Sequence, residues 1–158
     1  MNAIADIREA LGIHQPLLTS PGGKGEAAVS LVLHEPTGEP ELLYMERTAH
    51  GEDPWSGHIA FPGGRVEDQD PDLKHTAERE TLEEVGLDLS SAAYLGRLDD
   101  VTGASLPVVV AGFVYGIEHE PALALNPEVR EAFWVPFRKL LAPDRHLQAS
   151  FTFGGGEQ

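Results

Sequence analysis

The stretch GGRVEDQDPDLKHTAERETLEEVGL, residues 63–87, decides the fold because it holds a complete helix signal that follows a pair of glycines within a few residues. Pro71 and Asp72 are typical of a helix start, since proline is tolerated in the first turn and a carboxylate interacts favourably with the N-terminal end of the helix dipole. Gly86 is typical of a helix stop. We therefore expect a helix over roughly residues 72–85.

One side of this helix is expected to be buried. Apolar or small residues recur every four positions, at Leu73, Ala77, Thr81 and Val85. Residues four apart lie on one face of an α-helix, so this stripe predicts the face that packs on a sheet. With about 3.6 residues per turn, Glu80, Glu83 and Glu84 all flank the stripe.

Three neighbouring carboxylates at the edge of a buried face need positive charge, because otherwise they raise one another's pKa values. Arg79 lies four residues before Glu83 and can pair with it, but one arginine does not balance three glutamates. Divalent cations can do so, and Mg²⁺ in particular accepts a few carboxylates while it binds substrate phosphates. The simpler alternative, a solvated charged face, would place the glutamates opposite the stripe.

The composition narrows the kinds of ligand. The chain has no cysteine, so a metal must be held by oxygen or imidazole, which favours a hard divalent cation. The 26 acidic and 11 basic residues give a net charge of −15. This excess argues against duplex nucleic acid as a partner, because nonspecific DNA affinity comes from Lys and Arg. The Asp-x-Asp-x-Asp-Gly loop typical of acidic calcium-binding modules is absent.

Length and patterning predict one globular domain over residues 1–158. No apolar run is long enough to span a bilayer, and the first residues lack the pattern of a secretory signal. We therefore expect a cytoplasmic protein without membrane contact, and a homodimer is compatible with the sequence.

Strands are expected on both sides of the central helix. Residues 27–34 and 41–47 have the pattern of two strands that form a hairpin through EPTGEP. A loop is expected over 48–57. Further elements are predicted at residues 2–12 (helix), 58–61, 92–98 and 107–118 (strands) and 132–143 (a strand followed by a short helix).

The end of the opening stretch, RETLEEVGL at residues 79–87, resembles the signature of the Nudix hydrolase family, with Thr81 in place of the usual apolar residue. In the front half, Asp70 stands where that signature has glutamate, and eight residues rather than seven separate it from Arg79. Both features, together with FPGG at residues 61–64, resemble the coenzyme A pyrophosphatase branch of the family.

This resemblance implies an α/β/α sandwich around a mixed β-sheet, and Mg²⁺- or Mn²⁺-dependent hydrolysis of a nucleoside diphosphate linked to another group. It implies that the metals are held by the Gly64 carbonyl or its neighbour and by Glu80, Glu83 and Glu84, with Arg79 orienting Glu83. Which glutamate acts as the general base is left open. Glu128 resembles a further acidic residue that some members supply from a loop, and a plain surface glutamate is an equal alternative.

The segment before the helix supplies the candidate substrate-binding residues, which are Arg47, Trp55, Phe61 and Gly63. Trp55 can stack on a base or pack its loop on the sheet. Glu52 and Asp53 occupy the place where the coenzyme A branch has a second arginine, and their charges would repel a 3′-phosphate. We therefore expect a pyrophosphohydrolase of a nucleotide diphosphate derivative. The alternatives are a coenzyme A or acyl-coenzyme A pyrophosphatase and a Nudix-fold binding module without turnover.

Overall fold

The computed structural model describes residues 2–49, 57–103 and 105–145. The strands in these ranges are β1 (Gly25–His34), β2 (Glu41–Arg47), β3 (Ile59–Ala60), β4 (Gly63–Arg65), β5 (Ala93–Arg97), β6 (Val108–Ile117) and β7 (Val129–Pro136). The helices are α1 (Ala3–Ile13), α2 (Leu73–Val85) and α3 (Phe137–Leu141), with short 3₁₀ turns at Leu89–Ser91 and Pro143–Arg145.

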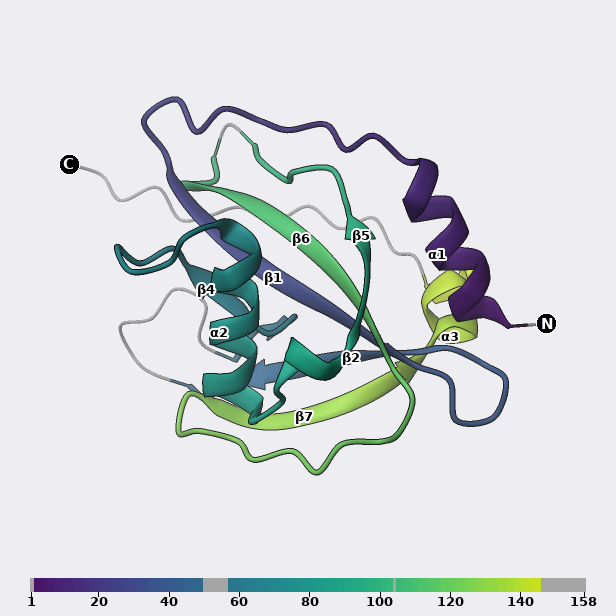
Figure 1. Ribbon diagram of the computed structural model, residues 1–158. Coiled ribbons are helices and arrows are strands. Elements are labelled where there is room, and N and C mark those ends of the chain that lie inside the picture. The colour runs from purple at the N-terminus through teal and green to yellow at the C-terminus, as the bar shows by residue number, and fades with distance from the viewer. Residues whose placement is uncertain (1, 50–56, 104, 146–158) are drawn as a thin grey trace.

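The strands form one mixed sheet in the order β3-β2-β1-β6-β5, with β4 against β1 and β7 against β2. Helix α2 lies over one face, while α1 and α3 lie together at the other side (Figure 1). One apolar core joins α2 to the sheet through residues such as Ala28, Ala77 and Phe113. A second core joins the opposite face to both other helices, because Leu33 and Val114 pack with apolar residues of α1 and α3. The predicted α/β/α sandwich is confirmed.

Helix α2 follows the sequence prediction closely. The Asp72 side chain accepts a hydrogen bond from the His75 N–H at 2.7 Å and caps the first turn. Gly86 ends the helix in the left-handed conformation with φ 71°, which glycine adopts without steric penalty. The predicted stripe faces the sheet, and Thr81 and Val85 are fully buried within it.

Thr81 is accommodated in the core through its hydroxyl as well as its methyl group. The hydroxyl donates to the Ala77 carbonyl at 2.7 Å and lies 2.9 Å from the Ser30 hydroxyl of β1. A buried hydroxyl is tolerated when it is hydrogen-bonded, so this substitution in the signature leaves the packing intact.

The predicted hairpin is only partly formed. Strands β1 and β2 pair at Leu33 with Leu42 and at His34 with Glu41. Parallel strand β6 occupies one edge of β1 over its whole length, and β4 occupies the other edge at residues 27–29. On its other edge, β2 pairs with β7 over its whole length, from Glu41 to Arg47.

Strand β4 is an element that sequence patterning did not predict. It consists of two glycines and Arg65, so it has no alternation of apolar and polar residues. A Cβ on Gly63 would lie 2.3 Å from the Ala28 carbonyl oxygen, which means that only glycine fits this close pairing with β1.

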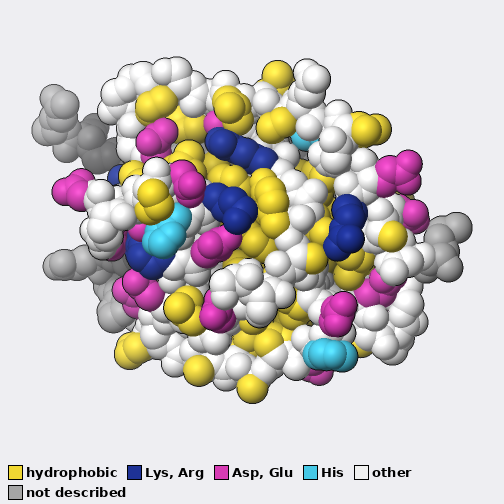
Figure 2. All heavy atoms as spheres, viewed as in Figure 1, with side chains coloured by type: hydrophobic (Ala, Val, Ile, Leu, Met, Phe, Trp, Pro, Cys, Tyr) yellow, Lys and Arg dark blue, Asp and Glu magenta, His cyan; other side chains and the backbone are white. Residues whose placement is uncertain are grey.

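On the face seen in Figure 2, Lys and Arg side chains lie in small separate groups among acidic and apolar atoms. None of the helices in the described ranges has the length and apolar character required to cross a membrane.

Candidate active site

A cavity of about 580 Å³ lies where β4 meets the C-terminal half of α2. Its acidic end is formed by Glu80, Glu84 and Glu128. Its apolar wall comes mainly from the sheet, with Ala27, Val29, Val108 and Val110 among the lining residues. The cavity can thus receive a ligand that has a charged part and a less polar part.

Glu84 is the most buried carboxylate at the acidic end. Its residue is 1% exposed, and its carboxylate accepts a hydrogen bond from the Gly63 N–H at 2.8 Å. Burial raises the pKa of Glu84 to about 8, the Gly63 hydrogen bond opposes the rise, and the charge of Glu80 adds to it. The positive charge of Arg47 opposes the rise without cancelling it, so an ionised Glu84 would be stabilised by a further cation.

Glu80 lies directly against the backbone of β4. A Cβ on Gly64 would be 2.6 Å from the Glu80 Cδ, so the glycine leaves space for this carboxylate. Burial raises the pKa of Glu80, the Arg79 hydrogen bond lowers it, and the charges of Glu83 and Glu128 raise it further. Glu80 and the Gly64 backbone are adjacent, as expected for two donors of one site.

Arg79 is held mainly by Asp70. Its Nε and Nη2 donate to the two Asp70 oxygens at 2.8 and 2.9 Å, while Nη1 donates to Glu80 at 3.0 Å and lies 3.3 Å from a Glu83 oxygen. The Asp70 side chain is fully buried and also accepts hydrogen bonds from the Glu67 N–H and the Thr76 hydroxyl. The Arg79 hydrogen bonds hold the pKa of Asp70 well below its usual range.

Asp70 was placed in the signature by the sequence analysis, but no role was assigned to it. The available signal was its position in the signature, where a carboxylate precedes the Arg-Glu pair. Its two-pronged contact fixes the plane of the Arg79 guanidinium, so the same arginine reaches Glu80 and Glu83 with its third nitrogen.

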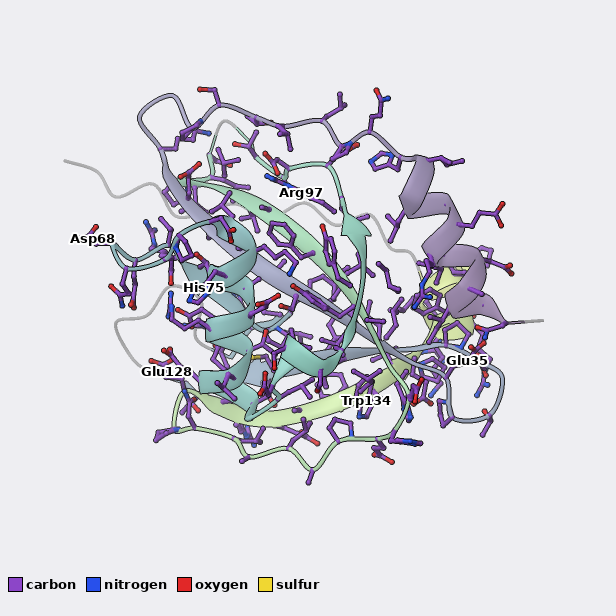
Figure 3. All side chains as sticks on the ribbon, viewed as in Figure 1. Glu35, Asp68, His75, Arg97, Glu128 and Trp134 are labelled. Carbon is purple, nitrogen blue, oxygen red and sulfur yellow. The ribbon has the colours of Figure 1, made fainter. Side chains whose placement is uncertain are left out.

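The remaining acidic candidates differ in position. Glu83 points toward Arg79 with its side chain 53% exposed, and it is absent from the cavity lining. Glu128 precedes β7 and lies beside the end of α2 (Figure 3). It lines the cavity together with Glu80 and Glu84, so the structure brings this distant residue to the acidic end.

Three of the four candidate substrate-binding residues line the cavity, namely Arg47, Phe61 and Gly63. The Phe61 ring packs on Tyr44 with ring centroids 4.8 Å apart. Trp55, Glu52 and Asp53 lie outside the described residues, so the predictions that concern them stay predictions. Arg65 also lines the cavity and was not predicted, although its place directly after the two glycines puts it beside the site.

The donors at the acidic end fit a hard divalent cation in their chemistry. They are carboxylate oxygens, which Mg²⁺ and Mn²⁺ prefer, and burial together with the neighbouring glutamate charges raises the pKa values of Glu80 and Glu84, so a bound cation would stabilise their ionised forms. In the described ranges, no three Asp, Glu or His side chains converge as a metal site in their present orientations. The reason is visible in their partners: Glu83 faces Arg79, and Glu84 faces the Gly63 N–H.

Known proteins with similar sequences point to one family. A family profile described as the NUDIX domain matches residues 24–153. An uncharacterized protein of Schizosaccharomyces pombe is 39% identical over 116 residues, which cover 68% of this chain and 35% of that protein. Human mitochondrial coenzyme A diphosphatase NUDT8 is 34% identical over 132 residues, which cover 82% of this chain and 56% of that protein. The chain thus spans about a third of the length of the first relative and just over half of the second.

Solved structures show the same fold at lower identity. A C. elegans Ap4A hydrolase binary complex superposes with a TM-score of 0.60 at 19% identity, covering 73% of this chain and 82% of that one. The NUDIX domain of Shewanella oneidensis NrtR complexed with ADP ribose gives a TM-score of 0.57 at 17% identity, covering 82% and 79% of the two chains. With the profile match over most of its length and the signature placed on β4 and α2, this chain belongs to the Nudix family.

Proposed function

We propose that this protein is a Mg²⁺- or Mn²⁺-dependent pyrophosphohydrolase that cleaves the diphosphate linkage of a nucleoside diphosphate derivative. The observation that carries the proposal is the cluster of Glu80, Glu84 and Glu128 at one end of a ligand-sized cavity. Burial and the charges of neighbouring glutamates raise the pKa values of Glu80 and Glu84, so their ionised forms would be stabilised by a bound cation. A divalent cation together with a diphosphate is a ligand pair that matches both the acidic end and the size of the cavity.

The metal-holding residues in this proposal are Glu80, Glu83, Glu84 and the Gly64 carbonyl. A bound divalent cation would supply positive charge to the diphosphate oxygens and lower the pKa of a water molecule. For Glu83 to join this set, its side chain must turn away from Arg79, which it contacts through an exposed and therefore weak ion pair. The proton of the attacking water is accepted by a carboxylate at the acidic end, for which Glu80, Glu84 and Glu128 are the candidates.

Arg79 acts as a positioning residue. Asp70 accepts hydrogen bonds from two of its nitrogens, and the third donates to Glu80. This contact stabilises the ionised form of Glu80 and limits the directions in which its oxygens can point. Arg47 lines the cavity and is a candidate contact for a phosphate oxygen of the substrate.

Within this activity, coenzyme A or an acyl-coenzyme A is a second candidate substrate class. It is favoured by the similarity to human NUDT8, which is named as a coenzyme A diphosphatase. Phe61 and Gly63, which belong to the FPGG pattern of the resemblance, line the cavity and could contact such a substrate. We further propose that the chain is a single domain that acts in the cytoplasm on a small molecule and does not bind duplex nucleic acid. A homodimer is compatible with this proposal.

The test is hydrolysis of a substrate panel with product identification by mass spectrometry. The panel contains ADP-ribose, NADH, dinucleoside polyphosphates, nucleoside triphosphates and coenzyme A, each with Mg²⁺, with Mn²⁺ and with a chelator. We expect metal-dependent cleavage between the two phosphorus atoms of at least one diphosphate. Glu84→Gln and Glu83→Gln should each lower kcat by at least about a hundredfold, because each removes one negative ligand of the metal.

The matched control is Glu78→Gln on the same helix. Glu78 pairs with Lys74 and Tyr115 and does not line the cavity, so this variant should keep normal turnover. Binding of a nucleotide without any cleavage across the panel would instead favour a Nudix-fold binding module. Equal activity of Glu84→Gln and the wild type would refute the placement of the metal at Glu84.

A further inference from the structure

Arg65 is a cavity-lining cation that the proposed chemistry does not use. It ends β4 and contributes to the same cavity as Glu80 and Glu84. Its guanidinium forms no ion pair or hydrogen bond among the residues that the structure describes, and only its backbone carbonyl is engaged, by Arg79. In a chain with a net charge of −15, an arginine without a carboxylate partner is notable, because acidic partners are abundant.

The guanidinium points away from the acidic end. Gly64 pairs with Ala28 and faces Glu80 of α2, whereas Arg65 pairs with Ala27 and faces the opposite side of the sheet. Nη1 of Arg65 lies 2.9 Å from the position that a Cβ on Gly25 would take. Residues 25 and 28 are three apart in an extended strand, a span of about 10 Å, so the guanidinium and the Glu80 carboxylate lie at separate ends of the cavity.

Gly25 leaves room for this side chain. The φ angle of Gly25 is not positive, so its backbone conformation does not require glycine. What matters at this position is the absence of a side chain. A Cβ would meet Arg65 Nη1 at 2.9 Å and the Val108 Cγ1 at 3.5 Å. The guanidinium therefore lies beside the start of β1, and Arg65 lines the cavity while the residue as a whole stays exposed to solvent.

This arrangement separates two anion-binding regions along one cavity. At one end, the carboxylates recruit cations that bind a diphosphate, as in the proposed function. At the other end, a free guanidinium offers up to five donors in a planar fork that matches phosphate geometry. The wall between them carries Ala27 and Val110, which suit the apolar faces of a sugar and a base.

We propose that Arg65 determines substrate specificity by binding a phosphate monoester on the ribose of the substrate, a group separate from the scissile diphosphate. The inference rests on the proposed function, because that function places the diphosphate at the glutamates. On a nucleoside diphosphate derivative, a second anionic group one sugar away from the diphosphate is a ribose phosphate. Arg65 would attract the ribose phosphate, whereas Glu52 and Asp53 are expected to repel it.

The experiment compares two substrates that differ by one phosphate, coenzyme A and 3′-dephospho-coenzyme A. Arg65→Gln should lower kcat/KM for coenzyme A about five- to tenfold through a higher KM, and change the value for the dephospho substrate by less than about twofold. Arg65→Lys should restore part of the difference, because lysine keeps the charge without the fork. Gly25→Ala should lower the ratio of kcat/KM for coenzyme A to kcat/KM for 3′-dephospho-coenzyme A, as Arg65→Gln does, since the added Cβ displaces the guanidinium.

The matched control is Arg8→Gln. Arg8 is also a cation without an ion pair in the described ranges, but it lies on α1 and lines a different cavity. The control should leave the ratio unchanged. Equal losses for both substrates in Arg65→Gln, or no loss for either, would overturn the proposal. An unchanged ratio in Gly25→Ala would refute the position assigned to the guanidinium.

A binding measurement separates this inference from the proposed function. Calorimetry with adenosine 3′,5′-bisphosphate and with adenosine 5′-monophosphate requires no turnover. If the wild type cleaves neither coenzyme A nor 3′-dephospho-coenzyme A, the proposed activity on these compounds fails. A loss of affinity in Arg65→Gln for the bisphosphate, but not for the monophosphate, would still support the phosphate site. Equal affinity of the wild type and Arg65→Gln for the bisphosphate overturns it.

Discussion

Glu84→Gln is expected to make the metal-free protein more stable at alkaline pH. Glu84 is almost fully buried, and its pKa rises from the ordinary value of 4.5 to about 8 in the folded chain. The folded protein therefore binds a proton that the unfolded chain has released, over the window between these two values. Because the folded state holds more protons there, the free energy of unfolding falls as pH rises through the window.

The size of this effect follows from the pKa difference. Each pKa unit corresponds to about 1.4 kcal/mol, so Glu84 lowers the free energy of unfolding by up to about 5 kcal/mol between pH 4.5 and 8. In a domain of this size, 1 kcal/mol moves the melting temperature by about 2–4 °C. Glutamine keeps the shape of the side chain and can still accept from the Gly63 N–H, but it carries no titrating proton.

The assay is thermal unfolding of both proteins in a chelator at pH 5, 6.5, 8 and 9. Relative to the wild type, Glu84→Gln should gain about 10 °C in melting temperature between pH 5 and 9. Glu78→Gln serves as the control, because Lys74 and Tyr115 lower the pKa of Glu78 in spite of its burial and its titration lies below this range. If the plots of melting temperature against pH were parallel for the wild type and Glu84→Gln over the whole range, the pKa of Glu84 would not be raised in the folded protein and the reasoning would be wrong.

Three further predictions concern the same site. Millimolar Mg²⁺ or Mn²⁺ at pH 8 should raise the melting temperature and a chelator should reverse this, because the cation binds only the folded site; a flat titration would contradict the site. Gly63→Ala should lower the free energy of unfolding by about 2–3 kcal/mol, since its Cβ meets rigid backbone, whereas Gly64→Ala should stay folded and lose activity because its Cβ displaces the Glu80 carboxylate. Denaturant titration and turnover of both variants check this, and equal stabilities would count against it. Asp70→Asn should lower the free energy of unfolding by about 2–4 kcal/mol above pH 5, because it removes the charge that pairs with Arg79. At this pH Asp70 is ionised in both the folded and the unfolded wild type, which is the reference.

Local signals account for the parts of the fold that sequence patterning predicted well. Helix α2 is specified by an Asp cap, a four-residue repeat and a terminal glycine, all within a few turns of the chain. Each of these signals acts within one or two helical turns, so the local sequence is sufficient to predict the helix. The position of Glu80, Glu83 and Glu84 at the edge of the buried stripe follows from the same geometry.

Other elements depended on pairing between distant segments. Strand β4 has no pattern of its own and forms because Gly63 fits against the backbone of β1. The hairpin of β1 and β2 was predicted as a unit, but β6 and β4 occupy most of the edges of β1. Strand pairing is a competition among all segments that can supply an edge, and adjacency in the chain is only one of the factors.

The sequence by itself determined the family signature, the amphipathic helix and the excess of negative charge at the site, because these follow from residue type and helical period alone. Only the tertiary structure decided that Glu128 joins Glu80 and Glu84, that Asp70 clamps Arg79, and that Arg65 faces the cavity without a carboxylate partner among the described residues. Those contacts depend on strand register and on the face from which each side chain projects. A shift of one residue in β4 would turn Arg65 toward α2 and Gly64 away from Glu80, so the direction in which Arg65 projects could not be predicted from its place after the two glycines.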